Sequence, residues 1–331
     1  MSDRSAFENP SVADGPYSLP HCEYPRATDI EQHDEQKLPL VLPPVDFTQS
    51  KPYRSRQYTA QPAASLSHTQ VLQMAEVVGT SFARNEPQTR HLRPPKNPPG
   101  GLIGAYHTDP FGHDVFGPWT TERLMYWFIR LLVLTDPTRP TSAMQVNEET
   151  LAQSLAIVDQ EGQVIGGAWN ETMPPLETEL AFRENDPFLT AVLSFAAPIL
   201  TLLSTQDAEA LTALCAQYPA FRQAYAQGRV GHHFMVARSE ALPKVDTFEL
   251  VAASAEHYQA LGYRYMVIEA SNQWTGAACE VLGGVRVHFA SYQARHTVHQ
   301  SAEPLADIVT SVNGWLSDKD SGSMFYVIRL V

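Results

Sequence analysis

Two adjacent histidines, His232 and His233, and one glutamate, Glu269, are the side chains best suited to take a proton from a reacting group. The histidines lie in the short apolar run GHHFMVAR, and Glu269 lies near the end of YRYMVIEASN. Imidazole changes charge near neutral pH, and burial raises the pKa of a carboxyl group. Because side chains alternate between the two faces of a strand, one histidine of the pair is expected to face a site. The alternative, a pair on the plain surface, stays open.

A fourth candidate is Cys279, in the helix-length run QWTGAACEVL. A thiol with an unperturbed pKa near 8.5 can act as an acid, and it becomes a nucleophile if its pKa is depressed. The alternative is a small buried residue on an apolar helix face. Cys215 shares a helix face with Leu211 and Leu214 and is expected to be a core thiol.

Two histidine-containing clusters could suggest a metal, but neither has the spacing of a known site. His107, Asp109, His113 and Asp114 form an HxDxxxHD pattern in a loop rich in proline and glycine, and His21, Cys22 and His33 lie in a polar N-terminal stretch. Three scattered cysteines without a CxxC pair suggest neither zinc nor a disulfide framework. The sequence therefore predicts no metal.

Charge and composition exclude several classes of protein. A chain of 331 residues with 44% hydrophobic residues can bury a large core. Its net charge of −13 argues against a nucleic-acid binder and weakly favours a cationic substrate such as an amine. The N-terminus lacks the pattern of a secretory signal, and no apolar run reaches the roughly 20 residues of a membrane span. We expect a cytoplasmic protein with no membrane partner.

The spacing of apolar residues and the positions of turn and capping residues predict the strands and helices that hold the candidate residues. Residues 1–50 carry many prolines and predict an extended or disordered arm, and residues 51–331 predict one domain. Predicted strands cover 53–62, 154–158, 164–170, 231–238, 264–270, 285–289 and 323–331, and predicted helices cover 66–83, 119–135, 248–261, 273–282 and 302–316. DQEG between 158 and 163 predicts a hairpin.

The stretch from about 174 to 228 adds two further predicted helices, 188–204 and 206–226, with Asp207 capping the second. This helical insertion either covers the acceptor end of the fold or forms a dimer surface, and a homodimer stays open.

The order of these elements resembles the GNAT N-acetyltransferase superfamily. The resemblance covers residues 53–331 without the insertion and is strongest over 231–292. There, ALGYRYMVIEASN, a short helix ending in Gly283-Gly284, and a final strand are similar to the last core unit of that family. The hairpin AIVDQEGQVIGG is also similar to one common in GNAT domains. The resemblance implies an α/β (α+β) fold with a central mixed, mostly antiparallel twisted sheet flanked by helices.

The resemblance also implies a binding site for acetyl-CoA or another acyl-CoA. The strand backbone at Val236, Ala237 and Arg238 would hold the pantetheine arm. The thioester would enter the gap between this strand and the strand 264–270, which Asn272 follows. The following loop would hold the pyrophosphate through Lys244, Val245, Asp246 and Thr247.

Two departures from the family pattern separate two functional hypotheses. The loop SEALPKVDTFE contains no glycine, and Cys279 stands where the family often has a tyrosine that protonates the leaving thiolate. Tyr263, Tyr265 and Tyr292 are possible replacements for that tyrosine. The first hypothesis is an N-acyltransferase, most simply an N-acetyltransferase, acting on a small-molecule or peptide amine. The second is a degenerate GNAT-fold module that senses CoA or binds a protein without turnover.

Overall fold

A single seven-stranded sheet organises the chain in the computed structural model, which describes residues 41–86, 89, 120–133, 147–174, 187–291 and 322–330. Its spatial order is β1-β2-β3-β4-β5-β7-β6, and only the β4–β5 pair is parallel. The strands are β1 (Ala60–Pro62), β2 (Leu155–Val158), β3 (Val164–Thr172), β4 (Val230–Arg238), β5 (Tyr265–Ala270), β6 (Val285–Ser291) and β7 (Gly322–Arg329). The predicted mixed, mostly antiparallel sheet is confirmed.

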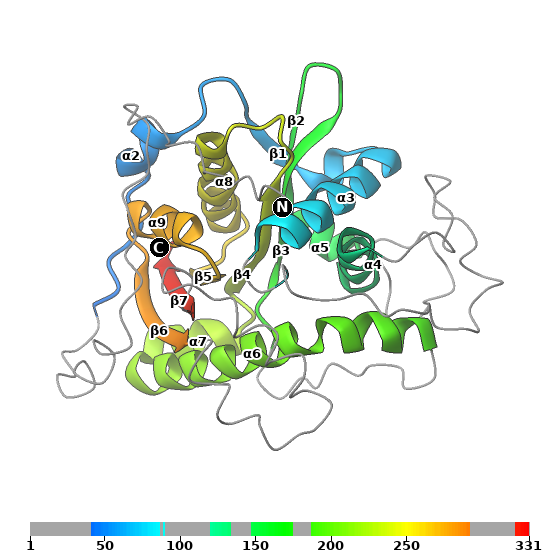
Figure 1. The fold of residues 1–331 in the computed structure, drawn as a ribbon. Helices are drawn as coiled ribbons and strands as arrows, with labels where there is room; N and C mark the ends of the chain where they lie inside the picture. Colours follow the sequence, from blue (N-terminus) through cyan, green and yellow to red (C-terminus); the bar gives the residue numbers. More distant parts are fainter. Residues whose placement is uncertain are drawn as a thin grey trace, which may run out of the picture.

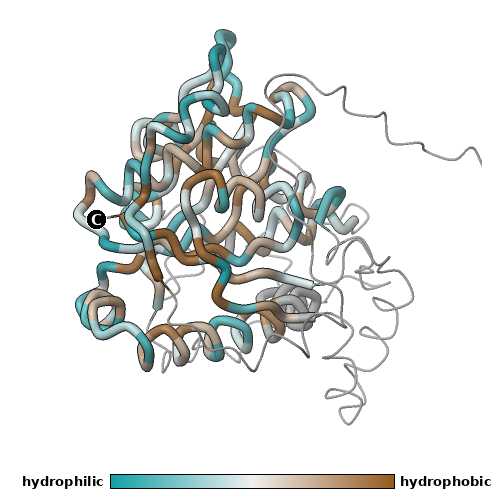
Figure 2. Tube along the Cα trace, turned by 90° about the vertical axis from the view of Figure 1, so that its left-hand side faces the viewer, coloured by the Kyte–Doolittle hydropathy of each residue, from teal (hydrophilic) through white to brown (hydrophobic). Residues whose placement is uncertain are grey.

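Helices cover both faces of the sheet (Figure 1). They are α2 (Phe47–Ser50), α3 (His68–Asn85), α4 (Thr121–Val133), α5 (Glu148–Gln153), α6 (Pro187–Gln217), α7 (Pro219–Ala226), α8 (Thr247–Ala260) and α9 (Gln273–Val281). Alternate residues of β5 show the two faces: Val267 packs in the cluster of α6 and α7, whereas Met266 and Ile268 pack with α8 and α9. Apolar residues accordingly gather in the interior strands (Figure 2).

Local signals start and stop the helices. Ser67 caps α3 in a capping box with Gln70, and Asn272 accepts a hydrogen bond from Thr275 N at the start of α9. Gly283 follows α9 with a φ of +76°, a conformation that suits glycine. Thr121–Val133 confirms the core of the predicted helix 119–135.

The strand β4 is irregular where it crosses the middle of the sheet. It carries one extra residue, Phe234, because His233 pairs with Asn170 whereas Met235 pairs with Trp169. Its pairing with β5 ends at His232–Val267, although β4 continues to Arg238 along β3 and β5 continues to Ala270. Within the described residues the two parallel strands therefore separate after His232, so the β5-facing edge of β4 is left without a strand partner.

The insertion differs from its prediction. Instead of a break at 204–206, α6 runs without interruption from Pro187 to Gln217, and the break comes at Tyr218-Pro219. Asp207 therefore does not cap a helix; it lies inside α6. The physical reason is that Pro219 cannot continue a helix, whereas the aspartate at 207 finds partners in the sheet.

The first strand and the N-terminal arm also differ in extent from their predictions. Only Ala60–Pro62 of the predicted strand 53–62 forms β1, because Arg54 turns toward two glutamates of α8. Residues 41–50 contain α2, and Val45 N bonds to Arg329 O of β7. The rest of the predicted arm, the predicted helix 302–316 and the clusters at His21 and His107 lie outside the described residues, so the division into arm and domain stays a prediction.

In the part of the chain that the structure describes, no helix has the length and apolarity needed to cross a membrane.

Candidate active site

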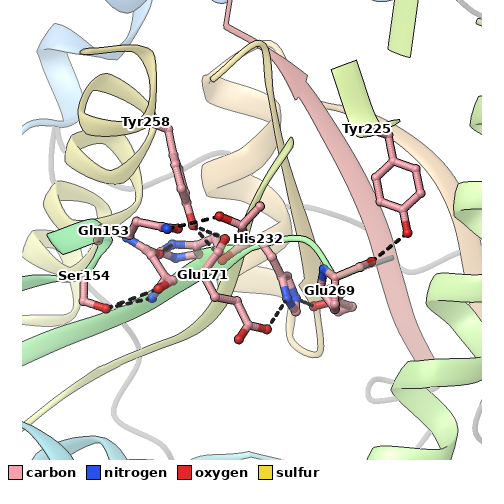
Figure 3. A network of polar contacts seen from close by, with 11 residues as sticks. Gln153, Ser154, Glu171, Tyr225, His232, Tyr258 and Glu269 are labelled. Atoms are coloured by element: carbon pink, nitrogen blue, oxygen red, sulfur yellow. Dashed lines mark hydrogen bonds and ion pairs between the residues drawn. The ribbon is translucent and has the colours of Figure 1, made fainter. Parts of the chain in front are cut away.

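The centre of the candidate site is His232, which lies between two carboxylates at the point where β4 and β5 separate (Figure 3). Its Nδ1 is 2.9 Å from Glu171 Oε1 of β3, and its Nε2 is 2.7 Å from Glu269 Oε2 of β5. Burial disfavours the charged imidazole, but the two carboxylates outweigh it and raise the pKa of His232 well above its usual value. His232 is therefore a cation at neutral pH, with both ring nitrogens donating.

A third carboxyl group, that of Asp207 in α6, extends this network beyond Glu269. Burial raises the pKa of Asp207, and the neighbouring Glu269 carboxylate raises it further. Burial acts in the same direction on Glu269, but the charge of His232 outweighs it and lowers the pKa of Glu269. Asp207 Oδ1 and Glu269 Oε1 are buried without a hydrogen-bond partner among the described residues. A proton kept on Asp207 and donated to Glu269 relieves the repulsion between the two carboxyl groups.

His233 points to the opposite face of the sheet and, unlike His232, is neutral. Its Nδ1 is 2.7 Å from Asn170 Oδ1, and the Asn170 amide nitrogen donates to Gln153 O and Ser254 Oγ. His233 Nδ1 must therefore carry the proton, which leaves Nε2 as the acceptor; among the described residues Nε2 has no partner. Burial and the nearby charge of His232 lower the pKa of His233 to about 3.

Tyr258 of α8 supports the backbone beneath the network. Its hydroxyl lies 2.8 Å from the carbonyl oxygen of Glu171 and 2.9 Å from that of His232 (Figure 3). Its ring packs against Gly231, where an added Cβ would lie 2.5 Å from a ring carbon. The tyrosine therefore fixes the position of both residues that hold the imidazole and its outer carboxylate.

A small cavity of about 50 Å³ adjoins the network on the α3, α4 and α6 side of the strand separation. Most of its lining is apolar, and the polar side chains are Thr89, Glu269 and Ser271. Its lining residues are Phe82, Thr89, Met125, Phe128, Leu200, Leu203, Phe234, Met235, Glu269 and Ser271. A carboxylate in an apolar cavity suits a small ammonium or amine group. No group of three His, Cys, Asp or Glu in the described ranges is arranged to hold a metal ion.

A third buried acid, Glu86, lies beside this cavity just after α3. Its carboxylate accepts hydrogen bonds from Ser271 Oγ and from Asn272 Nδ2, 3.0 Å away. The side-chain amide oxygen of Asn272 is meanwhile engaged by α9. Asn272 therefore ties α9 to the end of α3, so the mouth of the strand separation is held from both sides.

The loop after β4 is the part of the site that fits a pyrophosphate least well. Lys244, Val245 and Asp246 form a 3-10 turn, and Lys244 is exposed. The backbone N–H of Asp246 donates to Pro243 O, and that of Thr247 donates to carbonyls of the same turn. Asp246 makes no side-chain cap for α8. Two of the backbone donors that the resemblance assigned to the cofactor are thus used inside the loop.

The remaining sequence candidates divide between the strand edge and the core. Val236, Ala237 and Arg238 lie on the stretch of β4 that β5 does not cover, and the Arg238 guanidinium donates to Ser239 O and Leu242 O. Cys279 is fully buried in the cluster of α8, α9 and β7, away from the cavity lining. Tyr263 and Tyr265 lie at the start of β5, the end opposite the separation.

Three residues of the site were missed by sequence reasoning. Glu171, Asp207 and Glu86 come from a strand end, from the predicted insertion and from a helix end. Asp207 in STQDAEAL and Glu171 in WNETMPP both stand among polar residues, so the sequence carried no local signal for either. For Glu86 the signal was the acidic residue before Pro87 in SFARNEP, at the end of an apolar helix.

Comparison with known proteins identifies several similar structures. No protein-family model matches the chain, and no curated protein matches it. The C-terminal condensation domain of Ebony, solved with β-alanyl-dopamine, is 10% identical, with a TM-score of 0.50 over 82% of this chain and 99% of that one. Arylalkylamine N-acetyltransferase 2 from Aedes aegypti is 12% identical, with a TM-score of 0.49 over 83% of this chain and 99% of that one. A Drosophila melanogaster polyamine N-acetyltransferase is 10% identical, with a TM-score of 0.45 over 83% of this chain and 100% of that one.

Proposed function

We propose that the chain is an acyl-CoA-dependent N-acyltransferase that moves an acyl group, most simply acetyl, to a primary amine. Its sheet matches the one expected from the GNAT resemblance, and its fold is similar to that of the Ebony condensation domain. The observation that carries the proposal is the separation of β4 and β5 directly beside the Glu171–His232–Glu269–Asp207 network. An extended thioester arm can pair with the free edge of β4, and an amine can reach it from the cavity.

The network offers a path for the proton that the attacking amine must lose. Glu269 lines the cavity and is the proposed base. When Glu269 takes a proton at one end of the chain, His232 can release its Nδ1 proton to Glu171, whose side chain is 38% exposed. That proton then leaves from Glu171 to water. The starting state returns after the products leave, when Glu269 loses its proton through the cavity and His232 regains its Nδ1 proton from water through Glu171. Asp207 supplies a donor that steadies Glu269 between transfers.

The attack balances without a covalent intermediate on the protein. The amine nitrogen bonds to the thioester carbonyl carbon, the carbon–sulfur bond breaks, and CoA leaves as a thiolate. Backbone N–H groups of β4 around Val236–Arg238 are the proposed donors to the carbonyl oxygen. Cys279 stays a candidate acid for the thiolate, although the core that surrounds it excludes a leaving thiol without movement of α9.

Turnover tests the catalytic part of the proposal. Thiol release is measured with acetyl-CoA and a panel of small primary amines, for the native chain and for Glu269→Gln. General-base catalysis contributes about 10²- to 10⁴-fold, so we expect a loss of kcat in that range. Glu161→Gln in the exposed hairpin turn is the matched control and should keep the native rate. Equal rates for Glu269→Gln and the native chain would remove Glu269 from the mechanism.

Glu171→Gln tests the relay separately. The amide cannot accept a proton for release, yet it can still contact His232 Nδ1. We expect kcat to fall while KM stays near the native value, because Glu171 does not line the cavity. A rise in KM at unchanged kcat would instead indicate a role in amine binding.

The second candidate function is a GNAT-fold module that binds without turnover. The inward-turned N–H groups of Asp246 and Thr247 favour it. Calorimetric titration with acetyl-CoA and with free CoA tests the cofactor site, using Lys244→Ala and, as the control, the exposed Lys51→Ala. Micromolar binding that only Lys244→Ala weakens supports an enzyme or a CoA sensor, and thiol release with an amine then separates these two. Absence of heat with both ligands at millimolar concentration would exclude acyl-CoA as the substrate.

A further inference from the structure

A second hollow lies at the opposite end of β4 and β5 from the strand separation. It has a volume of about 610 Å³, which is within the usual range for small-molecule sites. Residues of α7 form part of its wall, Val41 and Leu42 form another part, and the ends of three neighbouring strands complete it. Arg229 at this end of β4 is three residues, or about 10 Å, from His232. The hollow shares no lining residue with the cavity at Glu269, so the two are separate recesses.

Three arginines line this hollow from adjacent positions in the sheet: Arg229 before β4, Arg264 before β5 and Arg329 at the end of β7. The topology brings them together because β4 and β5 start at the edge where the antiparallel β7 ends. Backbone hydrogen bonds fix the spacing of their backbones. Arg264 N donates to Arg229 O, and Leu330 N donates to Arg264 O, and each distance is 2.9 Å. The arrangement is thus a property of the rigid sheet.

The charge of this hollow is unusual for the protein. The chain has 36 acidic and 23 basic residues, yet no aspartate or glutamate is among the described residues that line the hollow. Arg229 and Arg264 make no ion pair with a described carboxylate, while Arg329 donates to Leu42 O. Three exposed arginines that line one hollow repel one another, and an anion bound between them would replace this repulsion with attraction.

Neutral donors complete the lining. Gln223 and Gln227 are exposed side chains of the α7 segment that face this hollow. Tyr218 also lines it, and the hydroxyl oxygen of this tyrosine is buried without a hydrogen-bond partner among the described residues. Burial raises the pKa of Tyr218, so the hydroxyl keeps its proton for donation. Amides, a phenol and arginine forks are the groups that recognise phosphate and carboxylate oxygens.

We propose that this hollow is a binding site for a small polyanion, a molecule with two or more phosphate or carboxylate groups, held chiefly by Arg229 and Arg264. Arginine binds such groups through two parallel N–H bonds, and the fixed spacing of the strands presets two or three forks for one ligand. The site does not depend on acyl transfer, because it shares no residue with the cavity at Glu269.

Calorimetric titration of the full chain with pyrophosphate, citrate and acetate tests this proposal. We expect saturable binding of pyrophosphate, citrate or both, and binding of the monoanion acetate at least about tenfold weaker. Preference for pyrophosphate identifies a phosphate ligand, and preference for citrate identifies a carboxylate ligand. No saturable binding of either polyanion at millimolar concentration would overturn the proposal.

Variants locate the site. Arg264→Gln should weaken the polyanion about tenfold or more, and Arg264→Lys should weaken it less, because lysine keeps the charge but not the fork. Arg222→Gln, an exposed arginine of α7 outside the lining, is the matched control and should keep the native affinity. The melting temperature of each variant checks its folding.

A last variant separates this hollow from the proposed CoA loop. Lys244→Ala should leave citrate affinity unchanged, because Lys244 belongs to the loop after β4, where the proposed CoA site offers pyrophosphate a second place to bind. If Lys244→Ala abolishes pyrophosphate and citrate binding while Arg264→Gln does not, the anion site is in the loop and the arginine hollow is excluded. That result would leave acyl transfer untouched, so the two proposals fail independently.

Discussion

His232 and His233 show how one step along a strand reverses the chemistry of a side chain. Both are buried, at 5% and 2% exposure, but only His232 faces carboxylates. His232 therefore holds a positive charge between Glu171 and Glu269, whereas His233 stays neutral beside an amide oxygen. The imidazolium makes His232 a relay and not a general base, since it has no free nitrogen to accept a proton.

The neutral state of His233 predicts a specific sensitivity to acid. Its pKa is about 3 in the folded chain against 6.5 for the free side chain, so below pH 6.5 only the unfolded chain binds this proton. Folding stability should therefore fall as pH decreases, by roughly 2 kcal/mol between pH 7 and 5 from this residue alone. Urea unfolding of the native chain and of His233→Gln, at pH 7 and pH 5, measures the difference.

The control for this measurement is Ser254→Ala, which changes the same hydrogen-bond network without removing a titrating group. It should keep the native dependence on pH. If His233→Gln loses as much stability between pH 7 and 5 as the native chain does, His233 titrates alike in both states, and the neutral assignment is wrong.

At the scale of elements, the site depends on how β4 is held between α8 on one face and α6 on the other. The Tyr258 hydroxyl of α8 binds the carbonyls at Glu171 and His232, and Gly231 leaves room for its ring. From the other face, α6 brings Asp207 to Glu269 because the helix continues past residue 204. A break there, as the sequence predicted, would free the aspartate from this alignment.

Gly231→Ala should destabilise the protein by roughly 1–3 kcal/mol, because the new methyl group overlaps a fully buried ring. The ring cannot move away without losing its contacts with the two carbonyls. Urea unfolding measures the cost. Gly167→Ala is the comparison: it meets the flexible Met74, which can change rotamer, and should cost less. A smaller loss for Gly231→Ala than for Gly167→Ala would mean that Tyr258 is not fixed.

At the scale of the molecule, an ion pair joins the N-terminal segment to α8. Arg54 contacts Glu249 through two nitrogens, each at 2.7 Å, and reaches Glu256 with a third at 2.7 Å. The Glu249 side chain is only 4% exposed. This pair draws the chain before β1 over the face of α8, which is why the predicted strand 53–62 shortens to three residues.

Arg54→Ala should cost about 3 kcal/mol or more, because it leaves the Glu249 carboxylate buried without its partner. Arg84→Ala is the matched control: its pairs with Glu122 and Glu240 are exposed, and their loss should cost less than about 1 kcal/mol. Adding Glu249→Gln to Arg54→Ala should restore part of the stability. Equal costs for the two arginines would show that Glu249 is hydrated.

Most strands and helices could be predicted because local chemistry decides them. Ser67, Asn272, Gly283 and the DQEG turn act within a few residues, and alternation or helical spacing assigns each apolar face. The resemblance of residues 231–292 to a GNAT core unit rested on such local signals in a fixed order, and it predicted the fold correctly. Length and composition indicated a large core for the same reason: both are properties of the chain alone.

Only the tertiary structure decided the electrostatics of the candidate site. His232, Glu171, Glu269 and Asp207 come from three strands and one helix, and their charges depend on burial and on neighbours distant in sequence. The same holds for the arginine hollow, whose three members meet because β7 runs antiparallel to β5. A pKa or a binding site depends on distances through space, and local sequence patterns carry no information about those distances.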